Sequence, residues 1–98
     1  MKINELKNVF EHPENYTREV YNEAVLINEH MDLHLIKMTA QLMSLALAKA
    51  RGRGKFGWWE PEMISQVDLV ERALACLRSG DFAKVIVYAA MLMARKTI

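Results

Sequence analysis

The stretch from Glu14 to Ala50, ENYTREVYNEAVLINEHMDLHLIKMTAQLMSLALAKA, contains neither glycine nor proline. Its apolar residues recur in steps of three and four, which is the spacing of one face of an α-helix. The members of this stripe are Val20, Ala24, Ile27, Met31, Leu35, Met38, Leu42 and Leu45. The spacing predicts a long amphipathic helix as the main element of the fold.

The length of this helix constrains its surroundings. A helix from Thr17 to Lys49 would extend roughly 50 Å at about 1.5 Å per residue, against a diameter of about 26 Å for a compact domain of this size. Either the helix breaks between Asn28 and Asp32, whose side chains can cap a new helix, or it is continuous and a second subunit covers its stripe. We expect the second arrangement.

Shorter helices are predicted on both sides of this stretch. Ile3, Leu6 and Phe10 lie at helical spacing before His12-Pro13 interrupts the pattern. After the long helix, Ser65 begins a capping-box pattern with Asp in place of the usual Glu. Gly80 can adopt the left-handed backbone conformation that ends a helix, and the next residue, Asp81, can cap the last helix.

These signals together predict an all-α fold with three main helices, at residues 16–50, 64–79 and 82–96, in a single helical domain of residues 1–98. On the second main helix, four apolar residues share one face: Val67, Val70, Leu74 and Leu77. Residues 85–94 are apolar without a polar face, so we expect the last helix to be surrounded on nearly all sides. The β-branched start of that run could form a strand, but no second run is available to pair with it.

Composition and charge narrow the class of protein. The 98 residues are 52% hydrophobic and 26% charged, which is typical of a folded globular protein. A chain this short builds a small core, so a second copy would help to stabilise it, and we expect a homodimer. Residues 1–50 carry five Lys and Arg against seven Asp and Glu, and residues 51–98 carry eight against five. A domain that binds duplex nucleic acid usually has a larger excess of basic residues, so the charge balance of this chain does not support general nucleic-acid binding.

The single cysteine, Cys76, excludes an internal disulfide and is typical of a protein in a reducing compartment. The N-terminal residues lack the apolar core of a secretion signal, and the longest apolar run is about half of a membrane span. We expect a cytoplasmic protein with no membrane partner.

The segment from Arg51 to Pro61, RGRGKFGWWEP, combines three cations, three large aromatics, three glycines and a proline. Cations and aromatics are the residues that dominate protein interfaces, and they also grip and stack on single-stranded nucleic acid. Alternatively, the segment is a packed connector with solvated cations. The candidate partner-binding residues are Arg51, Arg53, Lys55, Phe56, Trp58 and Trp59. We expect a protein partner, with nucleic acid possible but not favoured.

One pair of histidines and one set of four carboxylates are candidate metal ligands. His30 and His34 have the i, i+4 spacing of a helical metal pair, but a third ligand is required. An all-α magnesium-dependent nucleotide pyrophosphohydrolase is an alternative function, with its carboxylates supplied by Glu19, Glu23, Glu29 and Asp32. The quartet lacks the complete spacing, so we expect no metal site, no cofactor and no catalytic residue.

The second half of the chain resembles small proteins encoded by phages and prophages. The resemblance rests on the segment 51–61, on Gly80-Asp81, and on the apolar residues from Tyr88 to Met93. It implies a small helical protein in the cytoplasm of an infected or lysogenic bacterium that binds host or phage components. The expected function is therefore that of a non-catalytic interaction protein.

Overall fold

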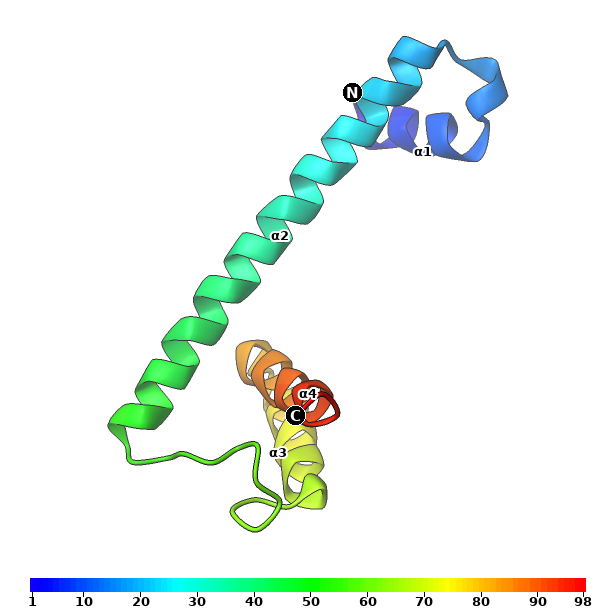
Figure 1. Ribbon diagram of the computed structural model, residues 1–98. Coiled ribbons are helices and arrows are strands. Elements are labelled where there is room, and N and C mark those ends of the chain that lie inside the picture. Colours follow the sequence, from blue (N-terminus) through cyan, green and yellow to red (C-terminus); the bar gives the residue numbers. More distant parts are fainter. The chain divides into compact units, whose positions relative to one another are not determined.

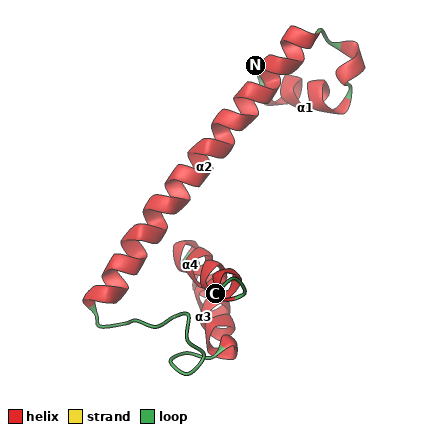
Figure 2. Cartoon of the chain, viewed as in Figure 1, coloured by secondary structure: helices red, strands yellow, loops and turns green.

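The computed structural model describes all residues from 1 to 98, and it contains helices and no strand (Figure 2). The elements in chain order are α1 (Ile3–Glu11), the 3₁₀ turn η1 (Pro13–Asn15), α2 (Arg18–Gly52), α3 (Gln66–Ser79) and α4 (Phe82–Arg95) (Figure 1). The prediction of an all-α fold with three main helices and a short N-terminal helix is confirmed. None of the helices combines the length and the apolar character needed to cross a membrane.

The chain forms two compact units, Met1–Met38 and Thr39–Ile98. The boundary between them falls inside α2, so each unit contains part of that helix. The two units are described separately below.

The first unit contains α1, η1 and the beginning of α2. The helix α1 ends at Glu11, and Pro13 opens η1, as the His12-Pro13 interruption predicts. The hydroxyl of Thr17 accepts a hydrogen bond from the backbone N–H of Val20 at 3.3 Å and so caps the start of α2. Two apolar side chains of this unit are fully buried, Val9 and Ala24. Beside them, the rings of Phe10 and Tyr21 meet edge to face with centroids 6.0 Å apart.

The helix α2 is continuous over 35 residues, which corresponds to about 52 Å. The alternative of a break between Asn28 and Asp32 is therefore wrong, because both residues lie in unbroken helix. The apolar stripe is only partly covered within one chain. Ala24 is buried, whereas Met31 is 58% exposed and Leu45 is 63% exposed.

The second unit contains the end of α2, the connecting segment, and the hairpin of α3 and α4, which pack against each other. The Ser65 hydroxyl accepts a hydrogen bond from the N–H of Asp68 at 3.0 Å, and Asp81 accepts one from the N–H of Lys84 at 3.3 Å. Gly80 lies between the helices with φ +80° in the left-handed region. All three predicted helix boundaries are confirmed. Leu69 and Val87 are the buried apolar side chains of this hairpin, and Leu69 is fully buried.

Much of the apolar surface of the hairpin is exposed. On α3, the predicted face of Val67, Val70, Leu74 and Leu77 is present but uncovered, and Leu69 packs instead. On α4, Phe82 and Ile86 are exposed one turn apart, and Met93 is exposed two turns further along the helix. The expectation that α4 is surrounded on nearly all sides is wrong for a single chain, because two short helices cannot enclose each other.

Candidate functional site

The end of α2 determines how the basic segment begins. The N–H of Lys55 donates to the carbonyl of Ala50 at 3.0 Å, and the N–H of Gly54 donates to the carbonyl of Arg51, also at 3.0 Å. With Gly54 at φ +76°, these bonds form a Schellman motif. The predicted connector therefore starts as an ordered helix end, which places Arg51 in the last turn and Lys55 just beyond it.

Gly57 determines the path of the next residues. It is buried and has φ +78°, a conformation that residues with a side chain rarely adopt. A Cβ atom added here would lie 2.9 Å from Cγ of Met63. The chain therefore needs glycine at this position for two reasons, conformation and space.

Arg95 ties the aromatic part of the segment to α4. Its Nε donates to the carbonyl of Trp58 at 2.7 Å, and a second guanidinium nitrogen donates to the carbonyl of Ile64. The planar guanidinium can satisfy two carbonyls at once because its donors diverge in a fixed fork. In the sequence, Arg95 is notable only as a cation in the last turn of a helix, where it complements the helix dipole. Its role as an anchor of the loop depends on contacts more than 30 residues apart, which no local pattern indicates.

The aromatic residues of the segment differ in exposure. The indoles of Trp58 and Trp59 meet edge to face, with centroids 5.7 Å apart and planes at 87°. Trp58 is half-buried, Trp59 is 44% exposed, and Phe56 is 72% exposed. Trp58 thus contributes to packing, while Trp59 and Phe56 offer apolar surface to a partner.

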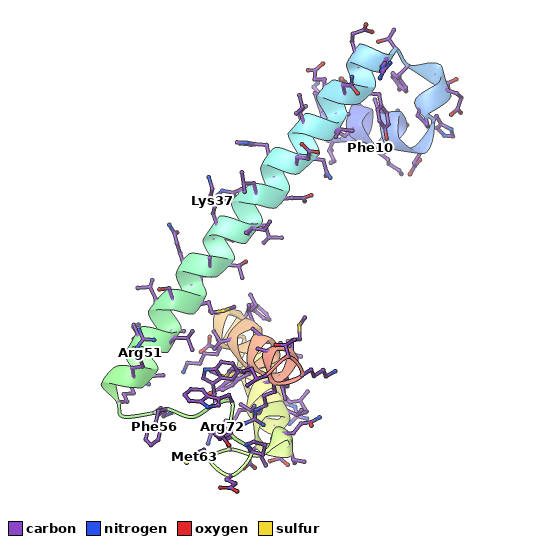
Figure 3. All side chains as sticks on the ribbon, viewed as in Figure 1. Phe10, Lys37, Arg51, Phe56, Met63 and Arg72 are labelled. Atoms are coloured by element: carbon purple, nitrogen blue, oxygen red, sulfur yellow. The ribbon has the colours of Figure 1, made fainter.

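The second unit contains an open groove of about 810 Å³. Its wall is formed by the last turns of α2, the connecting segment, and parts of α3 and α4. Figure 3 labels four residues of this wall: Arg51 on α2, Phe56 and Met63 on the connecting segment, and Arg72 on α3. All six candidate partner-binding residues line the groove: Arg51, Arg53, Lys55, Phe56, Trp58 and Trp59. The structure therefore brings together the residues that the sequence groups by proximity alone.

Further residues complete the wall of this groove, and the sequence does not assign them to the segment. The apolar ones include Leu42, Leu45, Met63, Leu69, Val87, Tyr88 and Met91. The additional cations are Lys49, Arg72 and Lys84. The helical stripe of α2 indicates Leu42 and Leu45, but nothing local indicates that Arg72 and Lys84 join the same wall.

The charge of the groove is strongly one-sided. Six cations line it against a single acid, Asp81. Asp81 lies 3.7 Å from Nζ of Lys84 and also caps α4. Lys84–Asp81 and His12–Glu14 are the ion pairs of the chain, so the other five cations of the groove have no acidic partner within 4.0 Å. An anionic partner would therefore meet cations that are not already neutralised.

The candidate metal ligands do not come together in one chain. Glu19, Glu23, Glu29 and Asp32 are exposed along α2, as are His30 and His34. No three histidine, cysteine, aspartate or glutamate side chains lie close enough to hold one ion. Cys76 is a free, half-buried thiol on α3.

Comparison with known proteins adds no further assignment. No protein-family model matches this chain, no curated protein matches it, and no solved structure matches it. The functional inference therefore rests on the geometry and charge of the groove.

Proposed function

We propose that this chain is a non-catalytic interaction protein that binds another protein, of host or phage origin, through the groove formed around residues 51–61. The observation that carries the proposal is the combination of five unpaired cations with exposed aromatic surface in one groove. Arginine and tryptophan side chains contribute most of the binding energy in typical interfaces, because they combine contact area with directed hydrogen bonds.

The construction of the groove also supports binding. The Schellman motif at Gly54, the left-handed Gly57 and the two bonds of Arg95 hold the segment in one conformation. A preorganised surface loses less entropy on binding than a flexible loop does. Homodimer formation belongs to the same proposal, because the stripe of α2 is exposed in the single chain.

Single-stranded nucleic acid is the second candidate partner. Phe56 and Trp59 could stack on bases while the cations contact phosphates. Such binding would weaken steeply as salt increases. A protein partner is favoured because the wall of the groove also contains many aliphatic side chains, which suit apolar side chains better than a phosphate backbone.

The test compares two variants with the same change in charge. Replacing Arg51, Arg53 and Lys55 by alanine should strongly reduce the amount of partner that co-purifies from a bacterial lysate. The control variant replaces Lys2, Lys7 and Arg78 by alanine; these residues are exposed and lie outside the groove, and the variant should retain the partner. Mass spectrometry of the captured fraction measures both.

The melting temperature separates binding from packing. The three substituted cations are exposed, so the free energy of unfolding of the triple variant should lie within about 0.5 kcal/mol of the wild-type value. A collapse of its melting temperature would instead support the alternative that the segment is a packed connector. Equal capture of the same proteins by both triple variants would contradict the proposed function.

A further inference from the structure

The two units of the chain carry opposite net charges. Residues 1–38 contain four Lys and Arg against seven Asp and Glu, which gives −3. Residues 39–98 contain nine against five, which gives +4. Each unit also leaves apolar surface uncovered. The first unit therefore combines acidic residues with exposed apolar surface, and the second unit combines basic residues with exposed apolar surface.

The acidic counterpart is the first part of α2. Within residues 18–38, the stripe residues Met31 and Met38 are 58% and 45% exposed. Helical periodicity places Glu23 and Asp32 on opposite borders of this stripe. Both acids are exposed, and neither forms an ion pair. This segment is an acidic helix whose apolar stripe is buried at Ala24 and exposed to solvent from Met31 to Met38.

The basic counterpart is the groove of the second unit. It is lined by aliphatic and aromatic side chains and by six cations, of which five lack an acidic partner. Amphipathic helices commonly bind in apolar grooves, where their apolar face is buried and their charged borders meet the rim. The groove therefore fits a helix of the type that residues 18–38 form.

We propose that residues 18–38 of a second copy of this chain occupy the groove of the first. In a two-fold symmetric dimer the same contact forms twice, because each copy offers both surfaces. One arrangement thereby covers the stripe of α2, fills the groove and pairs the opposite charges. The inference rests on the proposed function, because it uses the same groove as a protein-docking site; it names a second copy as the occupant, which a host or phage protein would have to displace.

The experiment is a charge exchange in the full chain. The first variant is E23K/D32K, the second is R51E/R53E, and the third combines all four substitutions. Each of the first two places like charges against each other and should weaken dimerisation by about tenfold or more in sedimentation equilibrium at low salt. The combined variant restores opposite charges and should recover dimerisation to within about threefold of the wild type.

Intrinsic fluorescence provides an independent measurement. Both tryptophans of the chain line the groove, and Trp59 is 44% exposed in the single chain. Diluting the wild-type protein from dimer to monomer should shift the emission to longer wavelength, as water reaches the indole. This measurement remains available if one of the charge variants fails to fold, which circular dichroism would reveal.

The possible outcomes have distinct meanings. A wild-type protein that stays monomeric at high concentration overturns the inference, as does a dimer that neither reversal weakens. A combined variant that is folded but does not recover dimerisation also overturns it. If R51E/R53E loses the proteins captured from a lysate while its self-association is unchanged, the proposed function stands and the second copy is excluded as the occupant.

Discussion

The two units of this protein have equally small cores and different surfaces. Residues 1–38 bury the side chains of Val9 and Ala24, and residues 39–98 bury those of Leu69 and Val87. The first unit is acidic, whereas the second is basic and contains a groove. Such small cores leave many large apolar side chains exposed, so covering them would add stability to either unit.

The largest expected effect tests whether the second unit depends on its one large buried side chain. Leu69→Ala should lower the free energy of unfolding by about 3 kcal/mol, because it removes buried methyl groups and leaves a cavity. Tryptophan fluorescence in urea measures this unit, since both tryptophans lie within it. Val67→Ala, at a position 64% exposed, is the control and should change stability by less than about 0.5 kcal/mol.

The corresponding substitution in the first unit tests whether that unit depends on Val9 in the same way. Val9→Ala should cost about 2 kcal/mol, because the smaller side chain buries less apolar area. The loss should be larger in circular dichroism, which reports all helices, than in tryptophan fluorescence. Equal shifts of both signals in both variants would contradict the division into two units.

The anchor of the connecting segment has the next largest expected effect. Arg95→Ala removes the donors to the carbonyls of Trp58 and Ile64 and should cost about 2 kcal/mol. Arg95→Lys should recover only part of this loss, because an ammonium group lacks the planar fork. Lys96→Ala is the matched control at an exposed neighbouring position. Equal urea midpoints for the Arg95 and Lys96 variants would show that the anchor does not stabilise the groove.

Two glycines of the same segment should respond in opposite directions. Gly57→Ala should destabilise by about 2 kcal/mol, because it combines left-handed strain with a clash against Met63. Gly52→Ala should stabilise by about 0.5 kcal/mol, because Gly52 lies in helix and its added Cβ meets no atom within 4 Å. Thermal unfolding of both variants measures the pair. A neutral Gly57→Ala would mean that this backbone path is not required.

The smallest expected effects concern the helix caps, one in each unit. Ser65→Ala should cost about 1 kcal/mol, because it removes the acceptor for the Asp68 N–H at the start of α3. Thr17→Ala should cost somewhat less, since its bond to Val20 is longer, 3.3 Å against 3.0 Å. Urea titrations followed by circular dichroism compare the two. A larger loss for Thr17→Ala would reverse the expected order of the two units.

Several elements could be predicted from the sequence because their causes are local. Proline at position 13 interrupts the N-terminal helix, Ser65 and Asp81 cap helices through residues three positions away, and Gly80 adopts the left-handed conformation that ends α3. The six candidate binding residues are likewise close in sequence and lie on one wall. In each case the interacting groups are neighbours along the chain, so spacing alone indicates the contact.

Other features could not be predicted because they join distant parts of the chain. The sequence left open whether α2 breaks near Asn28, and nothing in it indicated that Arg95 holds the loop or that Arg72 and Lys84 line the groove. The apolar run of α4 indicated that this helix is buried, but it did not indicate which surface covers it. Periodicity identifies a face, and it does not identify the surface that covers that face.

The number, type and approximate limits of the helices, and the opposite charges of the two halves, could be read from the amino-acid sequence. The structure was needed to show that α2 is unbroken, that residues of the segment 51–61 line a groove, and that α3 and α4 leave apolar faces uncovered. The difference lies in the range of the interactions. Caps, turns and helical periods act over a few residues, whereas packing and groove formation depend on which distant surfaces meet.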